Sequence, residues 1–189
     1  MARGGQGLAR VAVVVRAGAA PSWWLGVVAA GVGVVPSGLT GRRIGVLAGA
    51  VLFIVAAAVV AWAGRGRYLT PVRGAVRAGK HDVLQDRAVT LRAWRRGHRW
   101  WLLFGFVAAL GSSFALPAAG GMLLAGLGTG LRLKASWLGR RELDAGHLFW
   151  VPVDRLSRRA GRPTGRRVPE YRLTGIGAGD AAPGGGRRA

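Results

Sequence analysis

The most regular feature of the chain is the alternation of long charge-free apolar stretches with strongly basic ones. Residues 17–41, 44–64 and 100–131 contain no ionisable side chain. A helix needs about 20 apolar residues to cross the hydrocarbon of a bilayer. Core helices of a soluble protein rarely run to this length without a polar face, so the pattern predicts transmembrane helices.

The first two stretches predict one helical hairpin. We place the spans at residues 23–40 and 44–63, because Gly41, Arg42 and Arg43 form a natural tight turn between them. A cleaved signal peptide is the competing interpretation of the N-terminus. The apolar run Val11–Val15 is too short for one and is followed by Arg16, so we expect the first span to stay in the mature protein.

The third stretch is too long for one straight crossing. Its 32 residues would form a helix of about 48 Å at 1.5 Å per residue. Pro117, preceded by Ser112 and Ser113, offers a break, since the residue before a proline avoids the helical region. We therefore predict spans at residues 100–113 and 117–137. A re-entrant hairpin remains the alternative for residues 100–138.

The distribution of charge indicates how these helices are oriented. The chain has 28 Lys and Arg against 7 Asp and Glu, a net charge of +21. With four spans, 26 of the 28 basic residues fall on one side of the membrane, and the positive-inside rule makes that side cytoplasmic. The abundance of Arg, Gly, Ala and Val suggests a GC-rich bacterial genome. We expect a multi-pass protein of the bacterial cytoplasmic membrane with both termini in the cytoplasm.

The predicted fold class is an all-α integral membrane protein with four transmembrane helices in two hairpins. A basic N-terminus (residues 1–20) precedes the first hairpin (21–64). A basic loop (65–99) forms an amphipathic cytoplasmic helix before the second hairpin (100–138). A helical extension (139–160) and a disordered tail (161–189) follow, because the tail is rich in Gly, Pro and Arg and poor in apolar residues.

Three groups of residues are candidates for contacts with the membrane interface, with anionic groups and between helices. Tryptophans near the span ends fit the aromatic belt of a membrane interface: Trp23, Trp24, Trp62, Trp100, Trp101 and Trp137. Basic residues of the loop and tail fit contacts with anionic lipid or phosphate: Arg73, Arg77, Lys80, Arg87, Arg92, Arg95, Arg96, Arg99, Arg140 and Arg141. Small residues at four-residue spacing fit close helix packing: Gly45, Gly49, Gly105, Ala109, Gly126 and Gly130.

Residues able to carry chemistry are few. The chain has no cysteine, and its seven acidic residues lie outside the predicted spans, which disfavours ion-coupled transport. Glu142, Asp144 and His147 are too few for a metal-ligand set, and we expect a solvated helix end there. His81 and Asp82 lack a recognisable nucleophile and base. We predict no catalytic residue, no metal and no cofactor.

The sequence therefore favours a non-catalytic membrane protein that anchors or assembles something through its basic cytoplasmic face. The expected partners are anionic membrane lipids and another protein or a second copy of the chain. An accessory of DNA transfer or tethering, with nucleic acid bound through the same basic residues, is the main alternative. A pore or transport subunit acting with partner chains and a lipid-modifying enzyme are the others.

Overall fold

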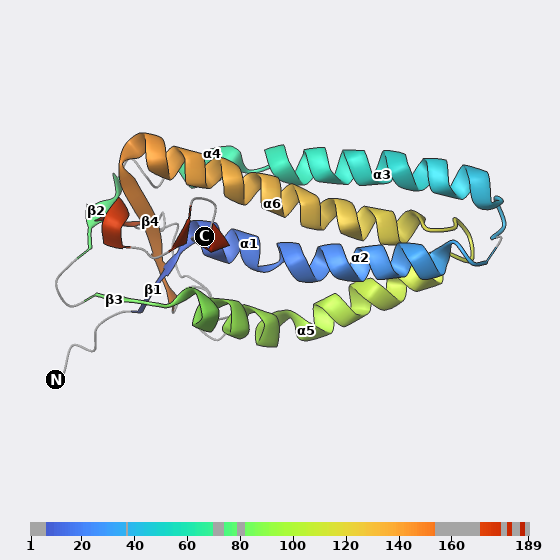
Figure 1. Cartoon of the computed structure of the whole chain (residues 1–189), viewed down its shortest axis with the longest axis horizontal. Coiled ribbons are helices and arrows are strands. Elements are labelled where there is room, and N and C mark those ends of the chain that lie inside the picture. The colour runs from blue at the N-terminus through green and yellow to red at the C-terminus, as the bar shows by residue number, and fades with distance from the viewer. Residues whose placement is uncertain are drawn as a thin grey trace. The chain divides into compact units, whose positions relative to one another are not determined.

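The chain is mostly helical, but it also contains a five-stranded sheet (Figure 1). The structure is a computed structural model and describes residues 7–36, 38–69, 74–78, 82–153, 171–178, 181–182 and 186–187. It divides into two compact units. The helix unit comprises Val15–Ala63 and Trp94–Lys134, and the sheet unit comprises Met1–Val14, Gly64–Ala93 and Ala135–Ala189.

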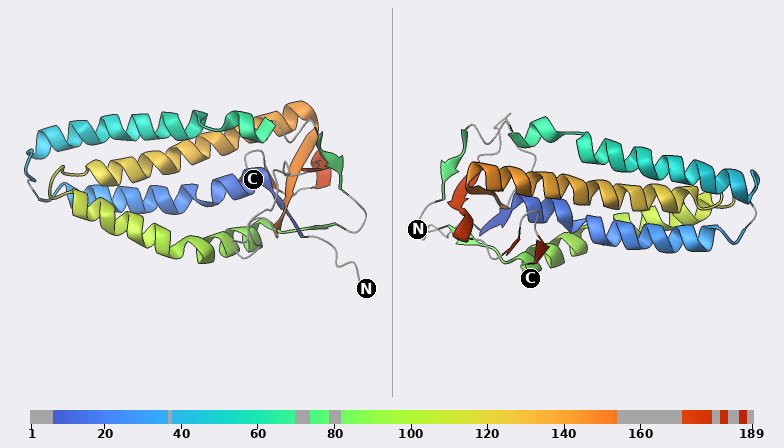
Figure 2. Two further views of the ribbon diagram at one scale, coloured as in Figure 1. Left: turned by 180° about the vertical axis from the view of Figure 1, so that it is seen from behind. Right: turned by 45° about the horizontal axis from the view of Figure 1, so that its top comes forward.

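The helix unit is built from four helices that run alternately up and down. They are α2 (Ala19–Gly33), α3 (Arg42–Trp62), the second half of α5 (Arg87–Ser112) and the first half of α6 (Ala119–Ala145). In all three ribbon views α6 lies between α2 and α3 (Figures 1 and 2). At one end of the unit, the turns that follow α2 and α5 are joined by a hydrogen bond from Leu39 N to Phe114 O.

The sheet unit is centred on β4 (His147–Pro152), which pairs antiparallel with β1 (Gly7–Arg10) and β5 (Arg172–Gly175). The short strands β2 (Val76–Arg77) and β3 (Val83–Leu84) pair in parallel with β5 and β1, which gives the order β2-β5-β4-β1-β3. Leu8, Leu148 and Trp150 form its buried apolar cluster. A separate hairpin joins β6 (Ala181–Ala182) to β7 (Gly186–Arg187).

The turn from α6 into β4 shows how local sequence sets the boundary. Gly146 has a φ of +68°, a left-handed conformation that glycine adopts at no steric cost. Its N–H donates to Leu143 O, the arrangement that ends many helices. The apolar strand β4 begins directly afterwards. Its backbone N–H and C=O groups pair with those of β1 and β5.

The prediction of an all-α fold is wrong. The loop 65–99 contains the short helix α4 (Arg65–Leu69), strands β2 and β3, and the start of α5, in place of one amphipathic helix. The extension after residue 139 stays helical only to Ala145 and then forms β4. Residues 172–175, expected in a disordered tail, form β5. Each of these strands is short, and each is formed by pairing with a distant part of the chain.

The helices also differ from the predicted spans. Two stretches of the described chain, Val11–Gly33 and Arg42–Trp62, are long and apolar enough to cross a membrane. The first of these includes the short helix α1 (Val11–Ala17) and starts twelve residues before the predicted span, since Arg16 does not interrupt the helix. The helices α5 and α6 do not meet the same criterion because both continue into basic residues.

Candidate membrane interface

Helix packing inside the helix unit depends on glycines of α6 that lie against neighbouring backbones. A Cβ added at Gly126 would lie 2.5 Å from Phe53 O, and one at Gly130 would lie 2.7 Å from Ala57 O. Real side chains do not approach a carbonyl oxygen so closely. The predicted pair Gly126 and Gly130 therefore lies at the contact between α6 and α3 of the same chain.

The matching face of α3 carries two pairs of small residues at four-residue spacing, one on each side of Phe53. Gly45 and Gly49 are buried against Pro117 and Met122, and Ala57 and Ala61 are buried further along the helix. Small residues at this spacing let two helices approach closely without a side chain between them.

The other two helices meet α6 in the same way. On α2, a Cβ at Gly26 would collide with the backbone of Ala125. On α5, Ala109 is buried, and its Cα would lie 2.9 Å from a Cβ placed on Gly120. Gly105 is more loosely placed, because a Cβ there would only touch the Leu124 side chain at 4.0 Å.

The outer faces of the same helices carry large apolar side chains. On α3, the buried small residues alternate with exposed branched ones, including Val51, which is 60% exposed. A soluble protein would bury its large apolar residues and expose polar ones. The exposed large apolar residues of the helix unit include Trp24, Val27, Val28, Val32, Val35, Leu47, Val51, Ile54, Val55, Val59, Leu103, Phe104, Val107 and Leu123.

Most of the predicted interface tryptophans are exposed. Trp24, Trp62, Trp100 and Trp101 have exposed side chains, while Trp23 is half-buried and contacts Trp24 edge to face at 4.8 Å. In the sheet unit Trp137 is half-buried, and the guanidinium carbons of Arg65 and Arg141 lie 5.0 Å and 5.8 Å from its ring. These distances suit cation–π attraction.

The basic residues of α5 form a row on one face of the helix. Arg95 and Arg96 lie three and four residues after Arg92, Arg99 lies four and three residues after them, and all four are exposed. On the opposite face, Trp94 and His98 are half-buried. There the Trp94 ring would touch a Cβ on Gly18 at 3.0 Å, and the His98 ring stacks on Trp94 at 4.3 Å.

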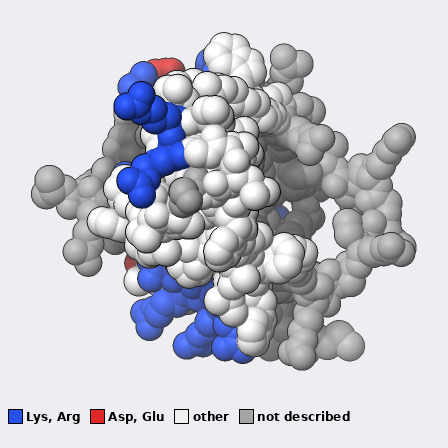
Figure 3. Space-filling model, turned by 90° about the vertical axis from the view of Figure 1, so that its right-hand side faces the viewer, with Lys and Arg blue, Asp and Glu red and all other residues white. Residues whose placement is uncertain are grey.

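The remaining predicted basic residues are scattered. Arg77 is exposed on β2, Arg87 is half-buried at the start of α5, and Arg140 and Arg141 are exposed on α6. Arg73 and Lys80 lie outside the described residues. On the face shown in Figure 3, uncharged residues account for most described atoms, and Lys and Arg lie in separate groups.

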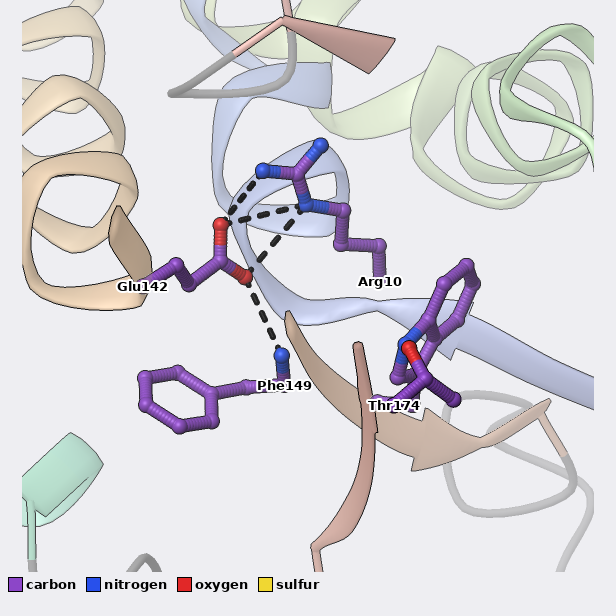
Figure 4. A network of polar contacts seen from close by, with 5 residues as sticks. Arg10, Glu142, Phe149 and Thr174 are labelled. Atoms are coloured by element: carbon purple, nitrogen blue, oxygen red, sulfur yellow. Dashed lines mark hydrogen bonds and ion pairs between the residues drawn. The ribbon is translucent and has the colours of Figure 1, made fainter. Parts of the chain in front are cut away.

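A buried polar network in the sheet unit was missed by sequence reasoning (Figure 4). The Nε of Arg10 donates to Glu142 Oε2 at 3.1 Å, and the N–H of Phe149 donates to Glu142 Oε1 at 3.2 Å. Glu142 is 1% exposed and Arg10 is 4% exposed. The expectation of a solvated helix end is therefore wrong for Glu142, although Asp144 and His147 are exposed. No signal in the sequence pairs residues 132 positions apart.

A second buried group of the sheet unit is Tyr171, whose ring stacks on Phe149 with centroids 6.3 Å apart. Burial, with a smaller contribution from Tyr68, raises the pKa of Tyr171 from 10.0 to about 12. Removal from water disfavours the tyrosinate, so the hydroxyl stays neutral over the ordinary pH range.

No chemical centre is assembled by these residues within the part of the chain that the structure describes. No three His, Asp or Glu side chains there are grouped so as to hold a metal ion. The buried acid Glu142 is used by Arg10 and by a backbone N–H, an arrangement that serves folding. What the geometry does provide is an apolar helical surface with a basic row on one helix.

Comparison with known proteins does not assign the chain to a family. No protein-family model, no curated protein and no solved structure gives a significant match to the chain.

Proposed function

We propose that the chain is a non-catalytic integral membrane protein whose helix unit lies in the bilayer. The observation that carries the proposal is the reversed pattern of the helix unit, with small residues at the helix contacts and large apolar residues outside. In water this surface would be a strong liability to aggregation. In lipid, exposed large apolar side chains carry no free-energy penalty. Helices associate there through close contact of small residues rather than through burial of large ones.

In this proposal Val11–Gly33 and Arg42–Trp62 form the first hairpin. The apolar parts of α5 and α6, residues 100–112 and 119–131, form the second. They are short and contain no charged residue, and α6 packs on both longer helices and on α5. The exposed apolar side chains of Leu103, Phe104 and Val107 on α5 support this placement.

Charge at the two ends of the helix unit supports an orientation. One end carries Arg16, Arg95, Arg96, Arg99, Arg132 and Lys134, whereas the other carries only Arg42 and Arg43. Under the positive-inside rule the first end faces the cytoplasm. The proposed location is the bacterial cytoplasmic membrane, with both termini in the cytoplasm.

Cysteine labelling tests this topology directly, because the chain has no cysteine of its own. Thr40 and Ala115 are exposed and joined by a hydrogen bond of 3.1 Å, so T40C and A115C should react with a membrane-impermeant maleimide added to spheroplasts. S136C should react only after permeabilisation. Labelling of S136C but not of T40C in intact spheroplasts would invert the orientation. Recovery of the protein in the soluble fraction would remove the proposal altogether.

The proposed role is that of an anchor or assembly subunit, which holds a partner at the membrane through the sheet unit and the basic residues. Co-purification from mildly solubilised membranes tests this role. A protein partner or a second copy should remain bound in stoichiometric amount. Isolation only as a single chain, with no partner after crosslinking in cells, would contradict the anchor role without affecting the membrane location.

The exposed arginine row of α5 favours one second candidate, an accessory that holds DNA at the membrane. Binding to the phosphate backbone releases counterions, so affinity should fall steeply with salt. The protein in detergent should then retain duplex DNA at low salt and lose it progressively as salt rises. Absence of retention at low salt would exclude this candidate.

A further inference from the structure

The outward face of α5 changes from basic to apolar at a single point along the helix. Arg92, Arg95, Arg96 and Arg99 make up its first part, and the same face continues through Leu103 and Val107 at four-residue spacing. Leu103 is 49% exposed and Val107 is 57% exposed. One continuous helix face thus presents cationic groups followed directly by hydrocarbon.

Among the residues that the structure describes, no acidic side chain pairs with Arg95, Arg96 or Arg99. Arg10 and Glu142, which do form an ion pair, belong to the sheet unit. Arg99 lies over the ring of its neighbour Trp100 at 5.4 Å, which holds its guanidinium beside an exposed indole. Three neighbouring cations repel one another, so an anion placed among them is stabilised.

The position of the apolar part narrows the class of anion. Leu103 lies one helical turn after Arg99, a rise of about 6 Å. Trp100 and Phe104 flank the same region and are 68% and 67% exposed. A phospholipid has its phosphate and its acyl chains joined in this order and over this distance. A nucleic-acid backbone has no hydrocarbon to place on Leu103, Phe104 and Val107.

The face of α5 opposite the arginines is partly occupied by the protein's own side chains. Trp94 and His98 stack on each other there, and Nδ1 of His98 lies 3.0 Å from Trp94 O. Ala109 is buried further along the same face. Around Trp94 and His98, the arginine side is therefore the side of α5 that is open to a phosphate group.

We propose that this face of α5 is a binding site for a single anionic phospholipid. Arg95, Arg96 and Arg99 hold the phosphate of the headgroup, and Trp100, Leu103 and Val107 contact the acyl chains. The site rests on the proposed membrane location, and it adds headgroup selectivity at a defined place. The arginine row is then a lipid site rather than a nucleic-acid site.

Native mass spectrometry of the full chain in detergent tests the site. Dioleoyl phosphatidylglycerol and dioleoyl phosphatidylcholine are added at equal concentration, and bound lipids are counted. We expect the first bound lipid to be phosphatidylglycerol. The variant R96Q/R99Q should weaken its binding by roughly 10- to 30-fold, as expected for two arginines near a lipid surface. The matched control R42Q/R43Q removes the same charge from the other end of the helix unit and should bind like the wild type.

Three results would overturn the site. In the first, the wild type retains the two lipids equally. In the second, R96Q/R99Q retains phosphatidylglycerol as well as the wild type does. In the third, R42Q/R43Q weakens phosphatidylglycerol binding as much as R96Q/R99Q does. Displacement of the bound lipid by duplex DNA at physiological salt would assign the row to nucleic acid. Each of these outcomes leaves the membrane location standing. A protein that stays soluble and monodisperse without detergent would instead remove the proposed function itself.

Fluorescence quenching by brominated acyl chains provides a second measurement that does not depend on charge. Phosphatidylglycerol with bromine on its acyl chains should quench tryptophan more strongly than brominated phosphatidylcholine. The variant W100F/W101F keeps apolar aromatic rings and should lose most of this difference. A difference unchanged in W100F/W101F would place the bound chains elsewhere.

Discussion

The guanidinium of Arg10 and the carboxylate of Glu142 form an ion pair in which both side chains are almost completely buried. Arg10 is the last residue of β1, and Glu142 lies on α6. The second carboxylate oxygen of Glu142 accepts the N–H of Phe149 in the central strand β4. The acid therefore connects three elements of the sheet unit that are far apart in the sequence.

Removing one partner of this pair should be strongly destabilising. In E142Q the guanidinium of Arg10 would stay buried without a counter-charge, a situation that typically costs about 3–5 kcal/mol. We expect a large fall in the apparent unfolding temperature in detergent. Tryptophan fluorescence measures this unfolding. D144N neutralises an exposed carboxylate two residues away and should change little. Similar behaviour of the two variants would mean that the pair contributes nothing.

The glycines of α6 should tolerate no side chain where they face α3. In G126A the new Cβ would lie 2.5 Å from Phe53 O, and relief of the overlap should cost about 1–3 kcal/mol. Gly97 is a helical glycine of α5 with open space around it. G97A should therefore be neutral or stabilising, since alanine is the better helix former. The measurement is thermal unfolding of the two variants in the same detergent.

Lys134 should stabilise the end of α3. Its Nζ donates to Ala63 O at 2.6 Å, and its side chain is buried. K134M keeps the apolar length of the side chain but removes a charge-assisted hydrogen bond, with an expected loss of about 1.5–3 kcal/mol. R132M removes an exposed charge two residues earlier and is the matched control. A smaller loss for K134M than for R132M would contradict this role.

The tyrosine titration should reveal the burial of Tyr171. The chain has two tyrosines, so Y68F leaves Tyr171 as the single phenol to titrate. By absorbance it should ionise well above 10, since burial is the main cause of its pKa of about 12. The native state binds this proton more tightly than the unfolded state, so stability should fall as the pH rises from about 10 to about 12. Ionisation near 10.0 in folded Y68F would show that the ring is hydrated.

The helices were more predictable than the sheet because their signal is local. The second predicted span, residues 44–63, coincides with α3, and the break predicted around Ser112 and Pro117 falls between the end of α5 and the start of α6. Charge-free length and a proline are enough to find such boundaries. The first apolar helical stretch begins at Val11 rather than at residue 23, because the residues after Arg16 continue the apolar run that precedes it.

The sheet could not be read from the sequence because none of its strands is convincing alone. β2 and β3 are two residues long, and β1 runs directly into α1. Val83, on the edge strand β3, is exposed, so no alternation of buried and exposed positions marks it. Strand formation here depends on pairing partners more than on the residues themselves. The contact between Arg10 and Glu142 was hidden for the same reason, since only the folded sheet unit brings them together.

The strand pairing of β1 has a consequence for the order of events during synthesis. Gly7–Arg10 leaves the ribosome before the first apolar helix, yet its partner strand β4 begins at His147 and β5 begins at Arg172. β1 can pair with β3 once Leu84 has been made, but its partner β4 follows only after α5 and α6. The sheet can be completed only after residues 172–175 have been made. Completion of the sheet thus requires that all the intervening helices have already been synthesised.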